Sequence, residues 1–180
     1  MKKINTFFKE KFKAVHIVIL AVITVLILAV MNLYLIPTIQ ETAKIYGYKM
    51  LDLYTFGYSM EEVQGLIENL SDRQLYLYKF VQLPLDMVFP IFYTLLFVAI
   101  LSKFGNENGK LLILPFALFI FDYCENVLSF IILSTGANLN AVVCVLASFA
   151  TIFKSIFLNA TILISLILFI VKIFKKRKSK

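Results

Sequence analysis

Four long runs of apolar residues dominate this chain and leave few folds open to it. The runs cover residues 14–36, about 80–101, 111–133 and 141–171. A helix needs about 20 apolar residues to cross the ~30 Å hydrocarbon core of a bilayer, so each run is long enough to span it. With 61% hydrophobic and only 16% charged residues, the chain is too apolar for a soluble globule. The sequence therefore predicts an integral membrane protein with four spans.

The continuity of the runs predicts helices rather than strands. A strand of a membrane barrel alternates apolar and polar residues over about ten positions, and these runs do not alternate. We expect an all-α fold, a four-helix transmembrane bundle that forms a single integral membrane domain over residues 1–180. The first run has a basic flank like that of a signal peptide. It is too long for one and no small-residue cleavage site follows, which indicates an uncleaved anchor.

The basic residues predict the orientation in the membrane. Five lysines precede the first run, Lys103 and Lys110 flank the loop between the second and third runs, and six basic residues end the chain. Six acidic residues lie in the segment 37–79. Because basic flanks stay on the inside, we expect a multi-pass protein of the cell membrane with both termini cytoplasmic and residues 37–79 outside. Topology and attraction to anionic lipid explain the net charge of +7, and no nucleic-acid partner is needed.

The outer segment is expected to be partly helical. Ser59-Met-Glu-Glu62 predicts a capping box at the start of a helix. The apolar positions that follow have helical spacing: Val63, Leu66, Ile67 and Leu70. The pattern predicts a short amphipathic helix that lies on the outer membrane surface or closes the top of the bundle. Ser71-Asp-Arg-Gln74 predicts a second capping box, at which the second spanning helix can begin.

Four ionisable residues interrupt the apolar spans, where charges are rare and usually functional: Asp86, Asp122, Glu125 and Lys154. Counted at ~1.5 Å per residue, Asp122 and Lys154 fall near the middle of their spans and the other two in the outer half. Helical spacing places further polar residues on the same faces. The candidate ligand-binding residues are therefore Asp86, Tyr93, Asp122, Glu125, Asn126, Lys154 and Asn159.

Charge balance and Pro90 suggest what such a site would hold. Three carboxylates against one ammonium group leave excess negative charge, which predicts a bound proton or cation. Pro90 cannot donate a backbone hydrogen bond to the carbonyl of Asp86, four residues earlier. We expect that freed oxygen to point into the same cavity as the Asp86 carboxylate, as backbone oxygens do in the broken helices of transporters.

No catalytic, cofactor or metal motif is present in the sequence. Cys124 and Cys144 lack CxxC spacing and a nearby His, which favours inert packing over a redox pair or a zinc site. The chain has no Gly-rich phosphate loop, no Ser/His/Asp set, no HExxH and no internal repeat. Catalytic residues stay unknown, and no cofactor or metal is expected.

Several short motifs resemble those of a known family. They are Gly57-Tyr-Ser-Met-Glu-Glu-Val, Leu70-Ser-Asp-Arg-Gln-Leu-Tyr76, Leu85-Asp-Met-Val-Phe-Pro-Ile-Phe-Tyr93, Asp122-Tyr-Cys-Glu-Asn126 and Phe153-Lys154. Together they are similar to a family of small uncharacterised four-helix integral membrane proteins of bacteria. The resemblance covers about Leu51 to Asn159 and implies fold and topology, but no activity, because none is assigned to that family.

Three functions remain open at this stage. The first is binding of a small cationic or amphipathic ligand, or carriage of protons or cations, through Asp86, Asp122 and Glu125. The second is a membrane enzyme that modifies a lipid headgroup, with the carboxylates as acid and base. The third is a non-catalytic subunit that docks another membrane protein. The charges are equally interpretable as interhelical contacts that fix register, each contributing ~0.6 to ~2 kcal/mol.

Overall fold

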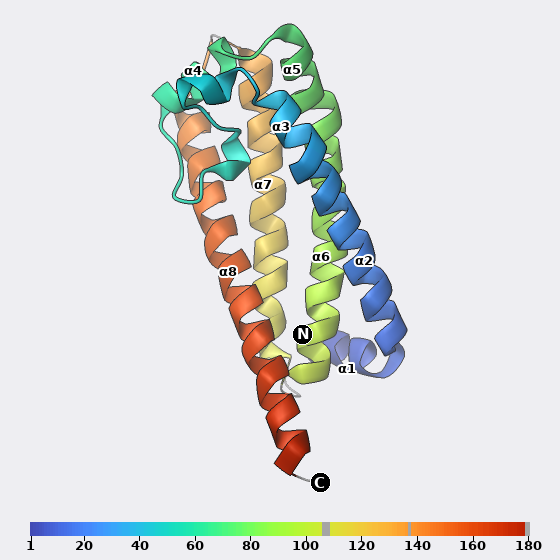
Figure 1. The fold of residues 1–180 in the computed structure, drawn as a ribbon. Helices are drawn as coiled ribbons and strands as arrows, with labels where there is room; N and C mark the ends of the chain where they lie inside the picture. Colours follow the sequence, from blue (N-terminus) through green and yellow to red (C-terminus); the bar gives the residue numbers. More distant parts are fainter. Residues whose placement is uncertain (106–108, 137, 179–180) are drawn as a thin grey trace.

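The computed structural model describes residues 1–105, 109–136 and 138–178. Over these residues the protein is helical, without strands. Four helices are long and apolar enough to cross a membrane: Ala14–Ile39, Asp72–Phe104, Lys110–Thr135 and Ala141–Lys172. They lie side by side, and both chain termini are at the same end of the molecule (Figure 1). We call this end the terminal end and the opposite one the α4 end.

Each long helix is assembled from consecutive elements. The first comprises α2 (Ala14–Val30), a π-turn (Met31–Leu35) and α3 (Ile36–Ile39), and the second comprises α5 (Asp72–Leu77), a π-turn (Tyr78–Gln82) and α6 (Leu83–Phe104). A 3-10 turn (Lys110–Leu112) leads into α7 (Ile113–Thr135), and α8 spans Ala141–Lys178. The shorter elements are α1 (Lys2–Lys11), α4 (Met60–Glu68) and two 3-10 turns (Ala43–Tyr46 and Leu51–Leu53).

Both predicted capping boxes are present. The Ser59 hydroxyl accepts a hydrogen bond from the Glu62 N–H at 3.2 Å, and Glu62 accepts one from the Ser59 N–H at 2.7 Å. Ser71 and Gln74 form the same reciprocal pair. The second box explains why the second long helix begins at Asp72 rather than near residue 80, where the apolar run starts.

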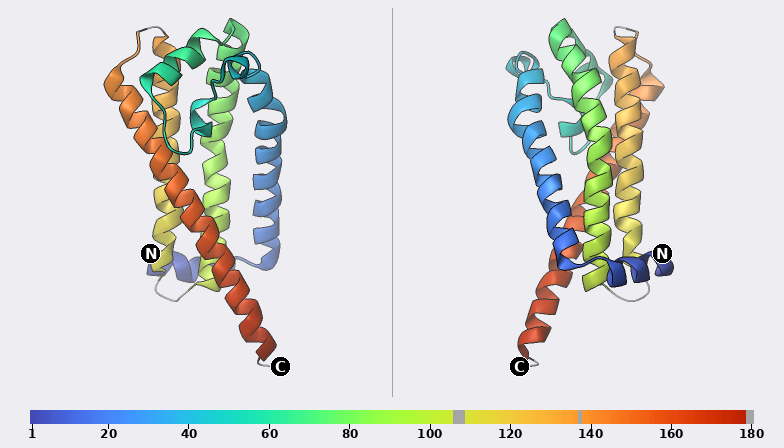
Figure 2. Two further views of the ribbon diagram at one scale, coloured as in Figure 1. Left: turned by 60° about the vertical axis from the view of Figure 1, so that its left-hand side comes forward. Right: turned by 90° about the vertical axis from the view of Figure 1, so that its right-hand side faces the viewer.

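The packing order places α6 at the centre of the fold. It contacts α1, α2, α7 and α8, while α7 packs along α8. Two clusters of buried apolar side chains form: one at the α4 end, around Ile39, Leu51, Leu66 and Tyr78, and one at the terminal end, around Val98 and Leu101. Figure 2 shows α1 lying across the terminal end and α8 extending beyond it. Polar residues of the long helices lie between the two clusters.

Each π-turn ends two residues before a proline. Met31–Leu35 precedes Pro37, and Tyr78–Gln82 precedes Pro84. A proline has no N–H for the carbonyl four residues earlier, and its ring pushes that carbonyl aside. The turn before it therefore widens to the i→i+5 pattern, which occurs often at functional sites. Both widened turns lie toward the α4 end of their helices.

The segment between Gly47 and Ser59 turns back into the molecule. It descends from the α4 end along α8 before it reaches α4 (Figure 1). Its backbone is held by two side chains: the Leu51 N–H donates to the Tyr78 hydroxyl at 3.0 Å, and the Tyr58 N–H donates to Ser148 Oγ at 2.8 Å. We call this segment, residues 48–58, the inward loop.

Candidate functional site

A cavity of about 510 Å³ lies between the two apolar clusters. The first helix, the inward loop, α6, α7 and α8 all contribute to its wall. Its polar and charged lining residues are Thr24, Asn32, Asp52, Thr55, Tyr93, Asp86, Asp122, Lys154, Ser155 and Asn159. Its apolar lining includes Leu28, Met31, Phe89, Leu96, Phe97, Leu118, Leu158 and Ile162. The cavity therefore combines an apolar wall with a concentration of ionisable groups.

The cavity reaches the protein surface between α2 and α8. Leu28 on α2 and Ile162 on α8 both line it, yet they are 44% and 40% exposed. Asn32 and Asn159 line it on the same two sides and are also exposed.

Four ionisable residues lie close together and are called the charged layer here: Asp86, Asp122, Glu125 and Lys154. Lys154 is its cationic member. Its ammonium group contacts the Glu125 carboxylate and lies 3.5 Å from Asp122 Oδ1. Glu125 is completely buried, and its Oε1 accepts a hydrogen bond of 2.5 Å from the Thr151 hydroxyl. Glu125 does not line the cavity. Lys154 and Thr151 of α8 thus compensate the negative charge of Glu125 behind the cavity wall.

Asp122 is also well supplied with partners. Its Oδ2 accepts a hydrogen bond of 2.5 Å from the Tyr93 hydroxyl, and its Oδ1 faces Lys154 and the Asn126 amide at 3.5 Å and 3.4 Å. These contacts come from α6, α7 and α8. The Asp122 carboxylate is therefore fixed in orientation with one edge toward the cavity.

The carbonyl that Pro90 frees is occupied, contrary to the expectation that it would face the cavity. Asn126 Nδ2 donates to the Asp86 carbonyl oxygen at 3.0 Å. Asn126 is buried on α7 and does not line the cavity. A side chain of the neighbouring helix thus replaces the missing backbone donor, and the helix break contributes no free oxygen ligand.

The Asp86 carboxylate is the exception among these acids. Asp86 lines the cavity and is only 5% exposed. Within the described part of the chain, no hydrogen bond or ion pair reaches its side-chain oxygens. A buried carboxylate without a partner is costly unless it binds a proton or a cation.

Asp52 is a fourth acid in the layer, and the sequence had placed it in the outer segment. The inward loop brings it to the cavity wall, where its Oδ1 lies 3.5 Å from the Tyr78 hydroxyl. Burial raises the pKa of Asp52 to about 6; the charge of Lys154 opposes this increase and that of Glu125 adds to it. The only local signal is the apolar pair around it, Leu51 and Leu53.

The seven candidate residues fall into two groups. Five line the cavity: Asp86, Tyr93, Asp122, Lys154 and Asn159. Glu125 and Asn126 lie behind its wall and hold Lys154 and the Asp86 backbone in place. Asn159 is exposed at the entrance, where its amide donates to the Ser155 carbonyl at 2.8 Å.

Neither cysteine belongs to this layer. Cys124 is exposed on α7 and Cys144 is buried on α8 in the apolar cluster of the α4 end. In the residues that the structure describes, no group of three or more His, Cys, Asp or Glu side chains is arranged to hold a metal ion.

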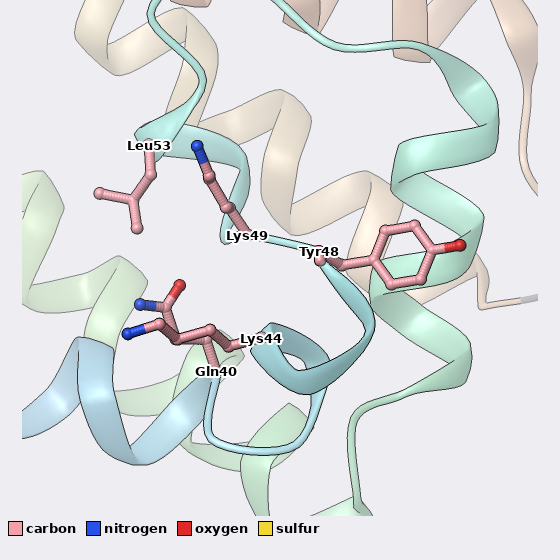
Figure 3. A pocket seen from close by; sticks show the side chains of 6 residues that line it. Gln40, Lys44, Tyr48, Lys49 and Leu53 are labelled. Carbon is pink, nitrogen blue, oxygen red and sulfur yellow. The ribbon is translucent and has the colours of Figure 1, made fainter.

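A second pocket of about 380 Å³ lies at the α4 end and has the opposite character. Gln40, Lys44, Gly47, Tyr48, Lys49 and Leu53 line it, without any acidic residue. In Figure 3 the side chains of Gln40 and Lys44 lie across the pocket from Leu53. Leu53 also lines the large cavity, so one side chain forms part of the wall of both.

No known protein family, curated protein or solved structure matches this chain. The resemblance to small four-helix bacterial membrane proteins thus stays a prediction. Function has to be inferred from the geometry of the cavity.

Proposed function

We propose that this protein is a four-span protein of the cell membrane whose cavity binds a small organic cation with an apolar part. In this proposal the long helices form a transmembrane bundle, the termini are cytoplasmic and the α4 end faces outward. The basic flanks support that orientation. The observation that carries the proposal is the Asp86 carboxylate in the cavity wall, which has no hydrogen bond or ion pair with any residue that the structure describes.

The charge of the layer favours a cationic ligand. Among the described residues at the cavity, four acids face one ammonium group, that of Lys154; the acids are Asp52, Asp86, Asp122 and Glu125. Lys154 is already engaged by Glu125 and Asp122. Asp86 and Asp52 are therefore left to attract a positive charge, and an anion would meet repulsion from both.

The remaining wall favours a ligand with apolar groups. The rings of Phe89 and Phe97 flank Tyr93, with centroids 5.1 Å and 6.3 Å from the Tyr93 ring. All three rings line the cavity, and aromatic faces attract cations as well as apolar surface. A cavity of about 510 Å³ has the size usual for small-molecule sites, which run from ~300 to ~1,000 Å³.

Interhelical contact alone does not account for Asp86. Lys154, Glu125, Asn126 and Asp122 link α6, α7 and α8, as structural polar residues in membranes do. The Asp86 carboxylate contributes nothing to that network within the described residues. A neutral residue would pack at this position without the cost of burying a charge. Binding of a cationic ligand accounts for the presence of a carboxylate here.

Binding of tetraphenylphosphonium to the purified protein in detergent tests the proposal. We expect saturable binding by calorimetry, and no binding of tetraphenylborate, which has the same shape and the opposite charge. Asp86→Asn should weaken tetraphenylphosphonium binding by about 10-fold or more, because it removes the opposite charge beside the cation. Glu41→Gln, which removes an exposed acid at the α4 end, should bind like the wild type. Equal binding of both ions, or none of the cation, contradicts the proposal.

A further inference from the structure

Asp52 lies at a partition between two hollows. The pocket at the α4 end is lined by the exposed residues Lys44, Gly47 and Lys49. Leu53 stands between that pocket and the cavity, and its neighbour Asp52 lines the cavity. The inward loop is thus thin at this point, and Asp52 is the ionisable group on its cavity side.

A column of polar side chains continues from Asp52 along the second long helix. Tyr78, Gln82 and Asp86 follow one another at four-residue spacing, one turn apart, and are 1%, 1% and 5% exposed. The column begins where the Tyr78 hydroxyl lies 3.5 Å from Asp52 Oδ1 and ends at the Asp86 carboxylate, which no described residue contacts by a hydrogen bond or ion pair.

Gln82 is the unexplained member of this column. Both its amide oxygen and its amide nitrogen are buried and have no hydrogen-bond partner among the described residues. A buried amide without partners is destabilising, so packing alone would favour an apolar residue here. Unpaired buried polar atoms are usually met by water, and an amide that orders water between two acids suits a proton path.

We propose that the cavity exchanges its cation for a proton, and that the proton passes between the cavity and the α4 end along Asp86, Gln82, Tyr78 and Asp52. This coupling rests on the proposed function, because it requires a cation in the cavity. When protonated, Asp86 and Asp52 hold one proton between them; a cation bound at Asp86 displaces this proton along the column, and it leaves through Asp52. In reverse, a proton that arrives from the α4 end neutralises an acid and releases the cation. Gln82 is a positioning residue in this path.

The surroundings of Asp52 set the pH range of the exchange. The groups that face it are Tyr78 and Asp86 on the second long helix, Asp122 and Glu125 on α7, and Lys154 on α8. Its pKa of about 6 lies above the ordinary value, with burial as the main cause. Below this pH Asp52 is protonated and the cavity is less negative, so cation binding weakens as pH falls. Above it the acid is ionised and cation binding reaches a plateau.

Tetraphenylphosphonium binding between about pH 5 and about pH 8, with a pH-indicator dye, tests the exchange. We expect proton release per cation to rise from almost none at about pH 8, through about one half near pH 6, toward one at about pH 5, with a Kd that rises up to about 10-fold per pH unit below pH 6. Asp52→Asn should still bind the cation but lose the change in Kd centred near pH 6, whereas Glu41→Gln should keep it. A constant Kd without proton release overturns the exchange and leaves cation binding intact. Absence of binding at every pH overturns the proposed function as well.

The path is tested separately with Gln82→Leu. Leucine fills a similar volume and needs no hydrogen bond, so the variant should fold, with equal or greater thermal stability. We expect an unchanged equilibrium Kd for tetraphenylphosphonium and a proton release at least about 10-fold slower in stopped-flow measurements. Tyr78→Phe, which removes the hydroxyl beside Asp52, should slow release in the same way. Wild-type release rates in both variants would show that the proton takes another route.

Discussion

The ammonium group of Lys154, which lines the cavity, contacts the carboxylate of Glu125, which lies behind the cavity wall. Asp122 Oδ1 lies 3.5 Å from the same ammonium group, and Asp122 has the Tyr93 hydroxyl as its closer partner. Lys154 and Glu125 therefore form the inner ion pair of the α7–α8 contact. In the proposed function, this leaves Asp86 and Asp52 for the cation and the proton.

Removal of Lys154 should test this pairing. Lys154→Met leaves Glu125 buried without its counter-charge, and we expect a loss of about 3 to 5 kcal/mol in unfolding free energy. Lys154→Met combined with Glu125→Gln removes both charges and should recover most of that loss. Unfolding in detergent, followed by far-ultraviolet circular dichroism, gives the comparison.

The matched control for this pair is Lys154→Met with Asp122→Asn. Asp122 keeps Tyr93 and Asn126 as partners, so this double variant should recover less stability than the one with Glu125→Gln. Equal recovery in the two double variants would show that Lys154 is shared evenly. No recovery in either would show that the ammonium group does not pair with α7 at all.

The Asn126 amide is predicted to stand in for the helical donor that Pro90 removes. Asn126→Leu leaves the Asp86 carbonyl buried and unbonded, which should cost about 1 to 3 kcal/mol. Pro90→Ala restores a backbone N–H four residues after Asp86, so Asn126→Leu should be much less harmful in a Pro90→Ala background. The same unfolding measurement decides the matter: additive losses would contradict this role for Asn126.

Gly57 should be required for the path of the inward loop. Its φ is +82°, and a Cβ there would lie 2.5 Å from Ser148 Oγ and 2.9 Å from Ile152 Cδ1. We expect Gly57→Ala to cost about 1 to 3 kcal/mol by overpacking, in addition to backbone strain, and to weaken cation binding by displacing Asp52. Gly47→Ala is the control, because Gly47 also has a positive φ but no atom within 4 Å of a Cβ. Similar losses in both would mean that the loop does not pack against α8.

The proposed orientation is testable with topology reporters. A fluorescent protein fused after Lys180 should fluoresce in the cytoplasm, and alkaline phosphatase inserted near Gly65 should be active outside. Both expectations follow from the excess of basic residues around the terminal end. The opposite pattern would place the α4 end in the cytoplasm and reverse the direction from which protons enter.

The parts of the fold that could be predicted from sequence are those with local causes. Four apolar runs specify four long helices, and Ser59 and Ser71 specify two helix starts through hydrogen bonds that span three residues. The helical phase that brings Asp86, Tyr93, Asp122 and Lys154 to one cavity is likewise a local property of each helix.

The parts that could not be predicted depend on contacts between distant residues. Asp52 reaches the cavity because Tyr78 and Ser148 hold the backbone of the inward loop, and neither partner is adjacent in sequence. In the same way, the freed carbonyl of Asp86 accepts a hydrogen bond from Asn126 on another helix. Hydropathy predicts that Asp52 is a surface residue of the outer segment, because a hydropathy pattern does not contain the path of a loop.

A crystal structure of the protein with tetraphenylarsonium tests the central claim, a cation site at Asp86, most directly. The arsenic atom scatters anomalously and marks the position of the cation. Cation binding in the cavity predicts one anomalous peak between α2 and α8, enclosed by Phe89, Tyr93 and Phe97 and adjacent to the Asp86 carboxylate, and its loss in Asp86→Asn crystals grown with the same ligand. A peak elsewhere on the protein, or an unoccupied cavity at a ligand concentration that saturates binding in solution, would contradict the account.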